Sequence, residues 1–242
     1  MAWLTVIGYV LAGIIVAAGL AFLHLRHWLD HPPLPKIRRD GVRVACIGDS
    51  ITHGGGGLFF KDPNKSGYAP YLQEMFGEKY LALNYGHNGR TLLQSGDYPY
   101  RQSLMFTASQ NSDPAIVLIM LGTNDSKPHN WNAEEYEREL AEFVQIYKSL
   151  PGNPTTYLMV PPAAFVRKGK KEVVFDIRDT IIENEIVPIV KRVAEQIEAP
   201  LIDMFSATQD HPEYFQDGVH PNKLGSKALA KTIFEVLNTT IS

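Results

Sequence analysis

The chain has 242 residues, of which 45% are hydrophobic and 20% charged, a composition typical of a globular protein with a buried core. Its 23 basic and 26 acidic residues give a net charge of -3, so the basic surface that nucleic-acid binding requires is not expected. Cys46 is the single cysteine, which excludes an internal disulfide and a cysteine-based metal cluster.

The first predicted element is an apolar helix at the N-terminus. Residues 3–23 contain no charged side chain, and as a helix this run would span roughly 30 Å, the thickness of the hydrocarbon core of a bilayer. We therefore expect residues 1–30 to form a single-pass transmembrane anchor, which makes the membrane a partner of the chain. A cleaved signal peptide is the alternative, but no Lys or Arg precedes the run, which is also longer than the ~7–15 residues of a usual signal-peptide core.

A proline-rich segment follows at residues 31–42. Pro32, Pro33 and Pro35 predict an extended tether, because each proline fixes its own φ and disfavours a helical conformation in the residue before it. The folded domain is then expected to occupy residues 43–242.

Strands alternate with helices along this domain. Short apolar runs predict strands at 42–47, 81–85, 115–121, 156–160 and 201–203. Helical spacing of apolar residues predicts helices at 68–76, 133–150, 181–197 and 222–237. The alternation predicts an α/β fold, a flavodoxin-like three-layer sandwich in which helices cover both faces of a five-stranded parallel sheet.

Folds of this kind place their chemistry in the crevice at the carboxyl ends of the strands. Residues 161–180 form a loop-rich insertion after the fourth strand and are a candidate wall for a substrate pocket there. Trp131 and Phe165 are candidates either for lining this pocket or for packing behind it. The glycine run at 54–57 is not followed by Gly-Lys-Ser/Thr, so a loop over the site is expected rather than a phosphate-binding loop.

Four short polar segments lie just after a predicted strand or just before the last helix. They are GDSIT (48–52), NYGHNGR (84–90), GTND (122–125) and DGVHP (217–221). Each segment alone is explained by a helix cap or a turn. Together they bring a hydroxyl, amide donors, a carboxylate and an imidazole to one edge of the sheet. Asp49 and Asp125 are expected to brace the loops by hydrogen bonds.

In this order the four segments resemble those of the SGNH (GDSL-type) hydrolase superfamily, over residues 43–238. The resemblance implies that Ser50 is the nucleophile, His220 its general base and Asp217 the acid that orients the base. It also implies that the backbone N–H groups of Ser50 and Gly89 and the side-chain amide of Asn124 form the oxyanion hole. It implies neither a metal nor an organic cofactor.

Further segments are similar to the sialate O-acetylesterase-like, or carbohydrate esterase, branch of this superfamily. They are LGTNDSKP (121–128), NW (130–131) and VPP (160–162). This branch implies a serine ester hydrolase that removes short acyl groups, O-acetyl in particular, from a small-molecule or glycan substrate through an acyl-serine intermediate. The alternatives are a lysophospholipase or thioesterase for longer acyl chains and a non-catalytic glycan-binding module.

The sequence leaves open on which side of the membrane the domain lies, because two arguments point in opposite directions. Arg26, Lys36, Arg38 and Arg39 all come after the apolar run, so the positive-inside rule favours a cytoplasmic domain. Hydrolysis of envelope or imported glycans would favour the opposite side.

Overall fold

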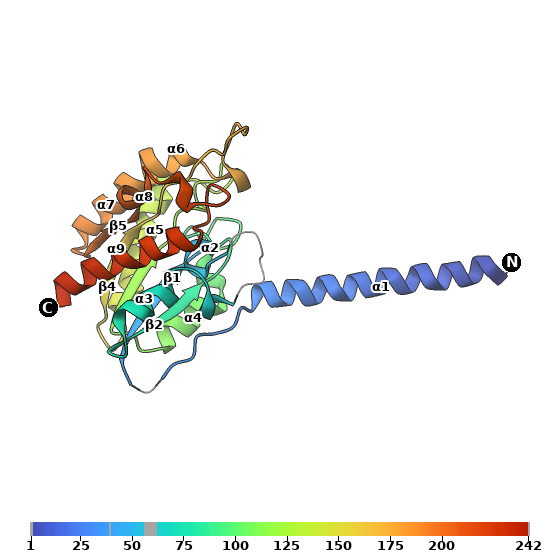
Figure 1. Cartoon of the computed structure of the whole chain (residues 1–242), viewed down its shortest axis with the longest axis horizontal. Coiled ribbons are helices and arrows are strands. Elements are labelled where there is room, and N and C mark those ends of the chain that lie inside the picture. Colours follow the sequence, from blue (N-terminus) through green and yellow to red (C-terminus); the bar gives the residue numbers. More distant parts are fainter. Residues whose placement is uncertain (1, 39, 56–61, 242) are drawn as a thin grey trace. The chain divides into compact units, whose positions relative to one another are not determined.

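The computed structural model of the chain describes residues 2–38, 40–55 and 62–241. Contacts between residues divide the chain into two compact units, Met1–Pro32 and Pro33–Ser242. The first unit contains helix α1, and the second contains the remaining helices and every strand that Figure 1 labels.

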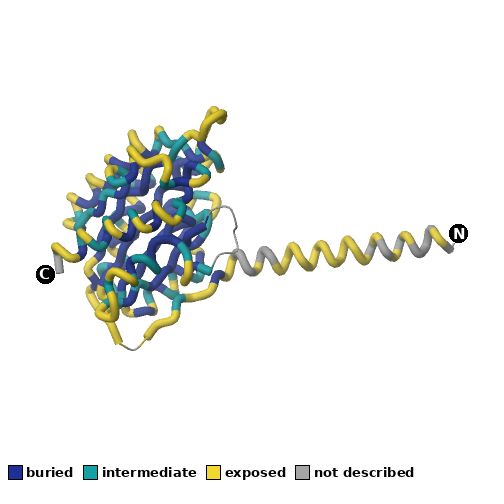
Figure 2. Tube along the Cα trace, viewed as in Figure 1, coloured by how far each residue is buried: buried dark blue, intermediate teal, exposed yellow. Residues whose placement is uncertain are grey.

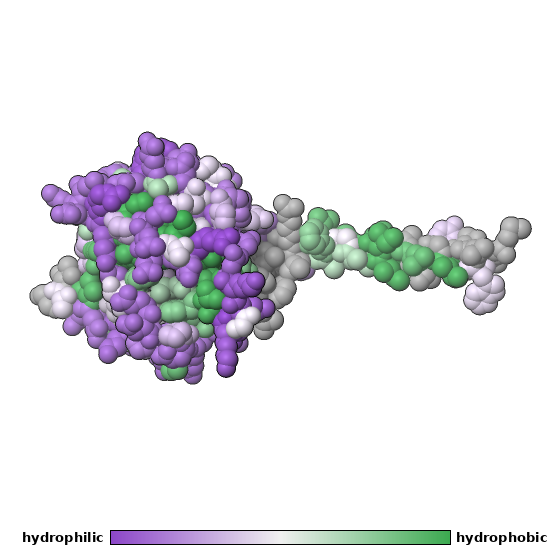
Figure 3. Space-filling view, turned by 90° about the horizontal axis from the view of Figure 1, so that it is seen from above, coloured by the Kyte–Doolittle hydropathy of each residue, from purple (hydrophilic) through white to green (hydrophobic). Residues whose placement is uncertain are grey.

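Helix α1 spans Ala2–Asp30 and includes the uncharged run of the sequence. Trp3, Ile15 and Phe22 are among its exposed apolar side chains, and Figure 3 shows hydrophobic side chains along it. Crossing a bilayer takes about 20 predominantly apolar residues. Of the side chains that the structure describes, no helix offers a stretch long enough and apolar enough to do so. The transmembrane anchor expected at residues 1–30 therefore receives no support from the structure.

The second unit is built on one sheet of five parallel strands in the order β2-β1-β3-β4-β5. The strands are β1 (Val42–Gly48), β2 (Tyr80–Gly86), β3 (Ile116–Met120), β4 (Thr155–Val160) and β5 (Leu201–Asp203). This order is that of flavodoxin-like folds. The predicted α/β fold with a five-stranded parallel sheet is therefore confirmed.

Helices cover both faces of this sheet, as Figure 1 shows. Helices α4 (Leu104–Asn111), α5 (Ala133–Lys148) and α7 (Val187–Gln196) pack with Ala45 and Ile47 of β1. Helices α3 (Ala69–Phe76), α8 (Met204–Thr208) and α9 (Lys223–Ile241) pack with Val44 and Cys46. Successive residues of β1 thus enter opposite cores because side chains alternate across a strand. Figure 2 shows these buried strands at the centre of the unit.

Cys46 lies in the middle of β1, where it pairs with Asn84 of β2 and Leu118 of β3. Its side chain is completely buried, and burial raises the pKa of its thiol to about 12. The thiolate is the reactive form of cysteine, so this residue acts as a small core side chain.

The helix predicted at 181–197 is divided into three parts. Helix α6 (Asp179–Ile181) continues into a π-helical stretch, Ile182–Ile186, and then into α7. Pro188, in the first turn of α7, has no N–H to donate, and its ring excludes the carbonyl four residues earlier. The wider π turn just before it accommodates this interruption.

Other short helices were not predicted. They are α2 (Ser50–His53), α4, α8 and the 3₁₀ turns Pro63–Lys65, Tyr100–Gln102, Val174–Asp176 and Pro212–Tyr214. Helix α4 carries a capping signal in the sequence, because Ser103 Oγ accepts the N–H of Phe106 at its first turn. Asn132 caps α5, since its Oδ1 accepts the N–H of Glu135 at 3.1 Å.

Candidate active site

Ser50 begins the short helix α2 immediately after β1. Asp49 caps this helix, and its Oδ1 accepts the N–H of Ile51 at 2.8 Å. Gly86, at the end of neighbouring β2, allows α2 to lie close, because a β-carbon at this position would collide with the backbone nitrogen of His53. The nucleophile candidate is thereby held at the carboxyl edge of the sheet.

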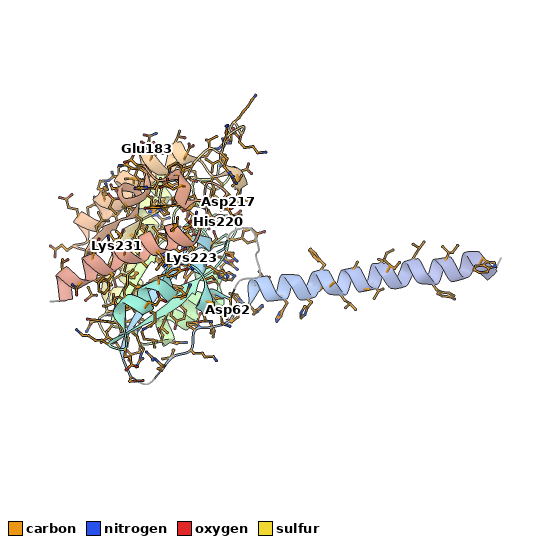
Figure 4. All side chains as sticks on the ribbon, viewed as in Figure 1. Asp62, Glu183, Asp217, His220, Lys223 and Lys231 are labelled. Carbon is orange, nitrogen blue, oxygen red and sulfur yellow. The ribbon has the colours of Figure 1, made fainter. Side chains whose placement is uncertain are left out.

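His220 and Asp217 lie on the turn before α9 and form one hydrogen-bonded chain with Ser50. The distance from His220 Nε2 to Ser50 Oγ is 2.9 Å, and that from His220 Nδ1 to Asp217 Oδ2 is 2.8 Å. A carboxylate only accepts hydrogen bonds, so we assign the ring proton to Nδ1, which leaves Nε2 to accept from the Ser50 hydroxyl. This arrangement can remove the hydroxyl proton as Ser50 attacks an electrophile. Figure 4 shows Asp217 and His220 beside each other.

Asp217 is fixed by its own turn. Its Oδ1 accepts the backbone N–H groups of Val219 at 3.0 Å and His220 at 2.8 Å. Burial alone would raise the pKa of Asp217, but the hydrogen bonds from His220 and Val219, with the charge of His220, lower it to about 2. Asp217 is therefore ionised at neutral pH and can stabilise a positive charge on His220.

The residues predicted to form the oxyanion hole lie around one cavity of about 170 Å³. Ser50, Gly89 and Asn124 all line it, together with His220. Asn124 Nδ2 donates to the carbonyl oxygen of Arg90 at 3.2 Å and to Asp49 Oδ2 at 3.4 Å. The first distance is at the long end of the usual range for N–H···O bonds and the second lies beyond it, so the amide can turn toward a stronger acceptor. The structure therefore brings all five predicted site residues together.

The insertion at 161–180 forms one wall of this cavity, as predicted. Phe175, Ile177 and Val219 supply its apolar lining. The ring of Phe175 meets the His220 ring edge-on, with 5.4 Å between ring centroids. Phe175 and Asp176 have φ angles of 61° and 58°, a left-handed conformation that costs free energy for residues other than glycine.

Trp131 and Phe165 do not line this cavity. Trp131 Nε1 donates to Glu185 Oε2 at 2.9 Å, and the Trp131 ring packs against Tyr136. Phe165 packs against Phe215. Both aromatic residues thus pack behind the site, which was one of the two alternatives for them.

A second cavity, of about 570 Å³, shares His220 with the first. Asp62, Lys65, Arg167 and Lys223 contribute charged side chains to its lining. Gly54 and Gly55 also line it, whereas the rest of the predicted glycine loop, residues 56 and 57, lies outside the described residues. Within the described ranges, no group of three or more His, Cys, Asp and Glu side chains is placed to hold a metal ion.

The residues of the second cavity and the apolar wall of the first were not predicted individually. The basic residues between 167 and 171 are visible in the sequence, but nothing there indicates which of them turns toward the site. The left-handed conformation of Phe175 has no local sequence signal, since a bulky aromatic residue is a poor candidate for it.

Two buried carboxyl groups hold the loops under the site. Asp125 accepts the N–H groups of Leu92 at 3.1 Å and Leu93 at 2.9 Å, and Asp49 caps α2. Burial raises the pKa of Asp49 to about 6 and that of Asp125 to about 7, although hydrogen bonds from Ile51, Leu92 and Leu93 oppose the effect. These contacts agree with the expectation that both residues brace loops.

The free energy of unfolding is expected to fall as pH rises from about 3.8 to about 7, because of these two carboxyl groups. The unfolded chain releases these two protons near pH 3.8, whereas the folded chain keeps them up to about 6 and about 7. More protons are then bound in the folded state, so stability decreases with pH, by about 1.4 kcal/mol for each unit of one group's pKa shift.

Urea unfolding at pH 5 and pH 8 measures this effect, and Asp49→Asn, which keeps a capping oxygen, should reduce the pH dependence. Carboxyl groups with a lowered pKa, such as Asp217, change the free energy of unfolding only below about pH 3.8, so they do not contribute to the difference between pH 5 and pH 8. Stability that rises between pH 5 and pH 8 would contradict the prediction.

Comparisons with known proteins identify a family and a shared fold. Residues 46–228 match the sequence model of the GDSL-like Lipase/Acylhydrolase family. An acetylxylan esterase from Xylanibacter ruminicola is 34% identical over 228 residues. The alignment covers 86% of this chain and 45% of that protein, so the chain spans less than half of the relative's length.

Solved structures share the fold. A lipase/acylhydrolase from Enterococcus faecalis superposes with a TM-score of 0.64 at 21% identity, covering 82% of this chain and 96% of that one. The acetyl xylan esterase AlAXEase gives a TM-score of 0.61 at 20% identity, covering 81% and 100%. At these identities the likeness concerns the fold alone.

Proposed function

The chain belongs to the GDSL-like lipase/acylhydrolase family, and from this premise we propose that it is a serine ester hydrolase that removes O-acetyl groups from carbohydrate. The family match agrees with the resemblance seen in the four polar segments. The observation that carries the proposal is the hydrogen-bonded chain from Ser50 Oγ through His220 to Asp217, with distances of 2.9 and 2.8 Å. A binding module would have no need of this chain.

The proposed reaction follows from where charge develops. His220 Nε2 takes the Ser50 proton as Oγ attacks the ester carbonyl carbon, and Asp217 stabilises the imidazolium that forms. The carbonyl oxygen becomes an oxyanion, held by the N–H groups of Ser50 and Gly89 and the Asn124 amide. Collapse breaks the bond to the alcohol, which receives the proton from His220. Water then hydrolyses the acyl-serine through the same steps.

The two cavities support a short acyl group. The one that holds the oxyanion donors is about 170 Å³ and is lined on its apolar side by Phe175, Ile177 and Val219. The larger one is lined by charged side chains. Among the described residues, neither cavity next to His220 is both large and apolar, as a long acyl chain would require. This favours an acetyl group over the lysophospholipase or thioesterase alternative.

The carbohydrate part of the proposal has separate support. The curated relative from Xylanibacter ruminicola and the solved AlAXEase are both named acetylxylan esterases. The larger cavity beside His220, with its polar lining, has room for a sugar on the alcohol side of the ester.

A series of 4-nitrophenyl esters tests the acyl preference. We expect kcat/KM to fall by at least about tenfold from acetate to octanoate, because the longer chain does not fit against Phe175. Phe175→Ala should narrow this difference by widening the cavity, whereas Val166→Ala, an exposed position on the same insertion, should leave it unchanged. An octanoate that reacts as fast as the acetate would favour the lipid alternative.

The membrane location, and with it the membrane as a partner, stays a prediction. Its support is the uncharged run of residues 3–23 in the sequence. Release of the full chain from isolated membranes by alkaline carbonate would count against it.

A further inference from the structure

We propose that the cavity of about 570 Å³ binds an anionic group on the alcohol half of the ester, so that the preferred substrates are acetylated sugars bearing a carboxylate. The inference rests on the proposed function and specifies its substrate. It follows from the position of the cavity, from the charges in its lining and from the contacts that fix two of them.

The position of the cavity matches the departing alcohol. His220, which gives its proton to this alcohol, lines the cavity together with Asp217. The cavity also lies near the nucleophile, because Gly55 lines it and a β-carbon at Gly55 would lie 3.1 Å from Ser50 Cβ. With the acyl group among the oxyanion donors in the smaller cavity, the sugar would extend into the larger one.

Both carboxylates in the lining have hydrogen-bond partners within the protein. Asp62 Oδ1 accepts both the backbone N–H and the side-chain amide of Asn64 at 3.0 Å, and its Oδ2 lies 4.0 Å from Lys65 Nζ. Asp217 is bonded to its own turn and to the His220 ring. These contacts hold both carboxylates in place, and their two negative charges stand against the three positive charges of Lys65, Arg167 and Lys223 in the same lining.

Two of the three cations in the lining are available. Arg167 and Lys223 form no ion pair with any side chain that the structure describes. The third cation, Lys65, lies at the long end of ion-pair distance from Asp62. The lining thus presents a guanidinium and an ammonium group that form no ion pair within the described ranges, beside the leaving-group position. An anion bound there would be attracted by both.

Both cations are attached to fixed backbone next to the catalytic turn. The N–H of Phe165 donates to the carbonyl oxygen of Gly218 at 2.8 Å, which ties the insertion to the turn between Asp217 and His220. Arg167 Cγ lies 3.5 Å from the place that a β-carbon at Gly218 would take. Lys223 is the first residue of α9, and Figure 4 shows it near His220. A planar carboxylate suits the fork of the guanidinium group, which favours an acidic sugar.

Matched substrates test the inference with the full chain. Acetate release is measured for an O-acetylated methyl glucuronide, for its uncharged uronate methyl ester and for the corresponding O-acetylated glucose 6-phosphate. We expect kcat/KM to be at least about tenfold higher for the free carboxylate than for its methyl ester, since two charge contacts are gained. The preference should weaken in 1 M salt, where the screening length falls to about 3 Å.

The double variant Arg167→Gln/Lys223→Gln should lower the ratio of the two kcat/KM values by about tenfold. Arg192→Gln/Lys231→Gln removes the same formal charge from exposed ion pairs with Glu137 and Glu235, outside the cavity, and should preserve the ratio. Figure 4 labels Lys231, farther along α9.

Three results would overturn the inference. Equal kcat/KM values for the carboxylate and its methyl ester in the wild-type chain would rule out the anion site and leave the esterase proposal intact. If both double variants lost the preference for the carboxylate alike, the preference would be a general effect of the protein's charge and not of this cavity. Preference for the phosphorylated sugar over the carboxylate would contradict the acidic-sugar assignment. Failure to hydrolyse any of the three sugars or 4-nitrophenyl acetate would instead reject the proposed function itself.

Discussion

Ser50→Ala and His220→Ala are each expected to lower kcat for acetyl ester hydrolysis by about 10⁴-fold or more. Without Ser50 there is no oxygen to form the acyl intermediate, and without His220 nothing at 2.9 Å accepts the proton of that oxygen. Residues that act as one unit lose nearly the whole effect when either is removed, so Ser50→Ala/His220→Ala should be little slower than the single variants. Steady-state rates with 4-nitrophenyl acetate measure all three variants.

Ser95→Ala is the matched control, because Ser95 Oγ donates to Glu135 on an exposed part of the chain. It should keep full activity. Urea midpoints of the active-site variants should stay close to that of the wild type, which separates lost chemistry from lost folding. A purified single variant that keeps more than a few per cent of the activity would contradict the assignment.

Covalent labelling distinguishes an enzyme from a binding module. A fluorescent organophosphonate should react with the wild type and with Ser95→Ala, and leave Ser50→Ala unlabelled. A wild-type chain that takes up no label would revive the non-catalytic glycan-binding alternative.

Asn124→Ala is expected to lower kcat by about 10²–10³-fold with little change in KM. The Asn124 amide is held by two long hydrogen bonds, to Arg90 and Asp49, and has a stronger acceptor once negative charge forms on the ester oxygen. A contact that strengthens mainly in the transition state appears in kcat. Comparison of kcat and KM for acetate esters checks the prediction.

The control for this change is Asn184→Ala, which alters an exposed position of the π-helical stretch. It should leave both kinetic constants unaffected. An Asn124→Ala variant whose KM rises while kcat stays constant would show that Asn124 binds the ground state instead.

The strands and the catalytic residues could be predicted from the sequence because both depend on local patterns. A run such as that of β3 is apolar at every position because the strand is covered on both faces. The polar segments that hold Ser50 and Asn124 follow β1 and β3 directly, and the ends of adjacent parallel strands meet at one edge of the sheet.

The surroundings of these residues could not be predicted because they depend on packing between distant segments. Arg167 reaches the site through the hydrogen bond between Phe165 and Gly218, which are more than fifty positions apart. Phe175 has a left-handed backbone conformation that its bulky side chain disfavours, so the surrounding structure must hold it there. By contrast, the apolar run at residues 3–23 predicts the helix that is seen, Ala2–Asp30.

The depth of Cys46 has a practical consequence. A reagent for sulfhydryl groups cannot reach the middle of β1 unless the strands on both sides separate, so its rate of modification in denaturant would report opening of the whole sheet. Because the chain has one cysteine, each molecule would give one readout. In the native protein, Cys46 is too deeply buried to react, so a cysteine introduced at the surface would be the only target for a spectroscopic tag.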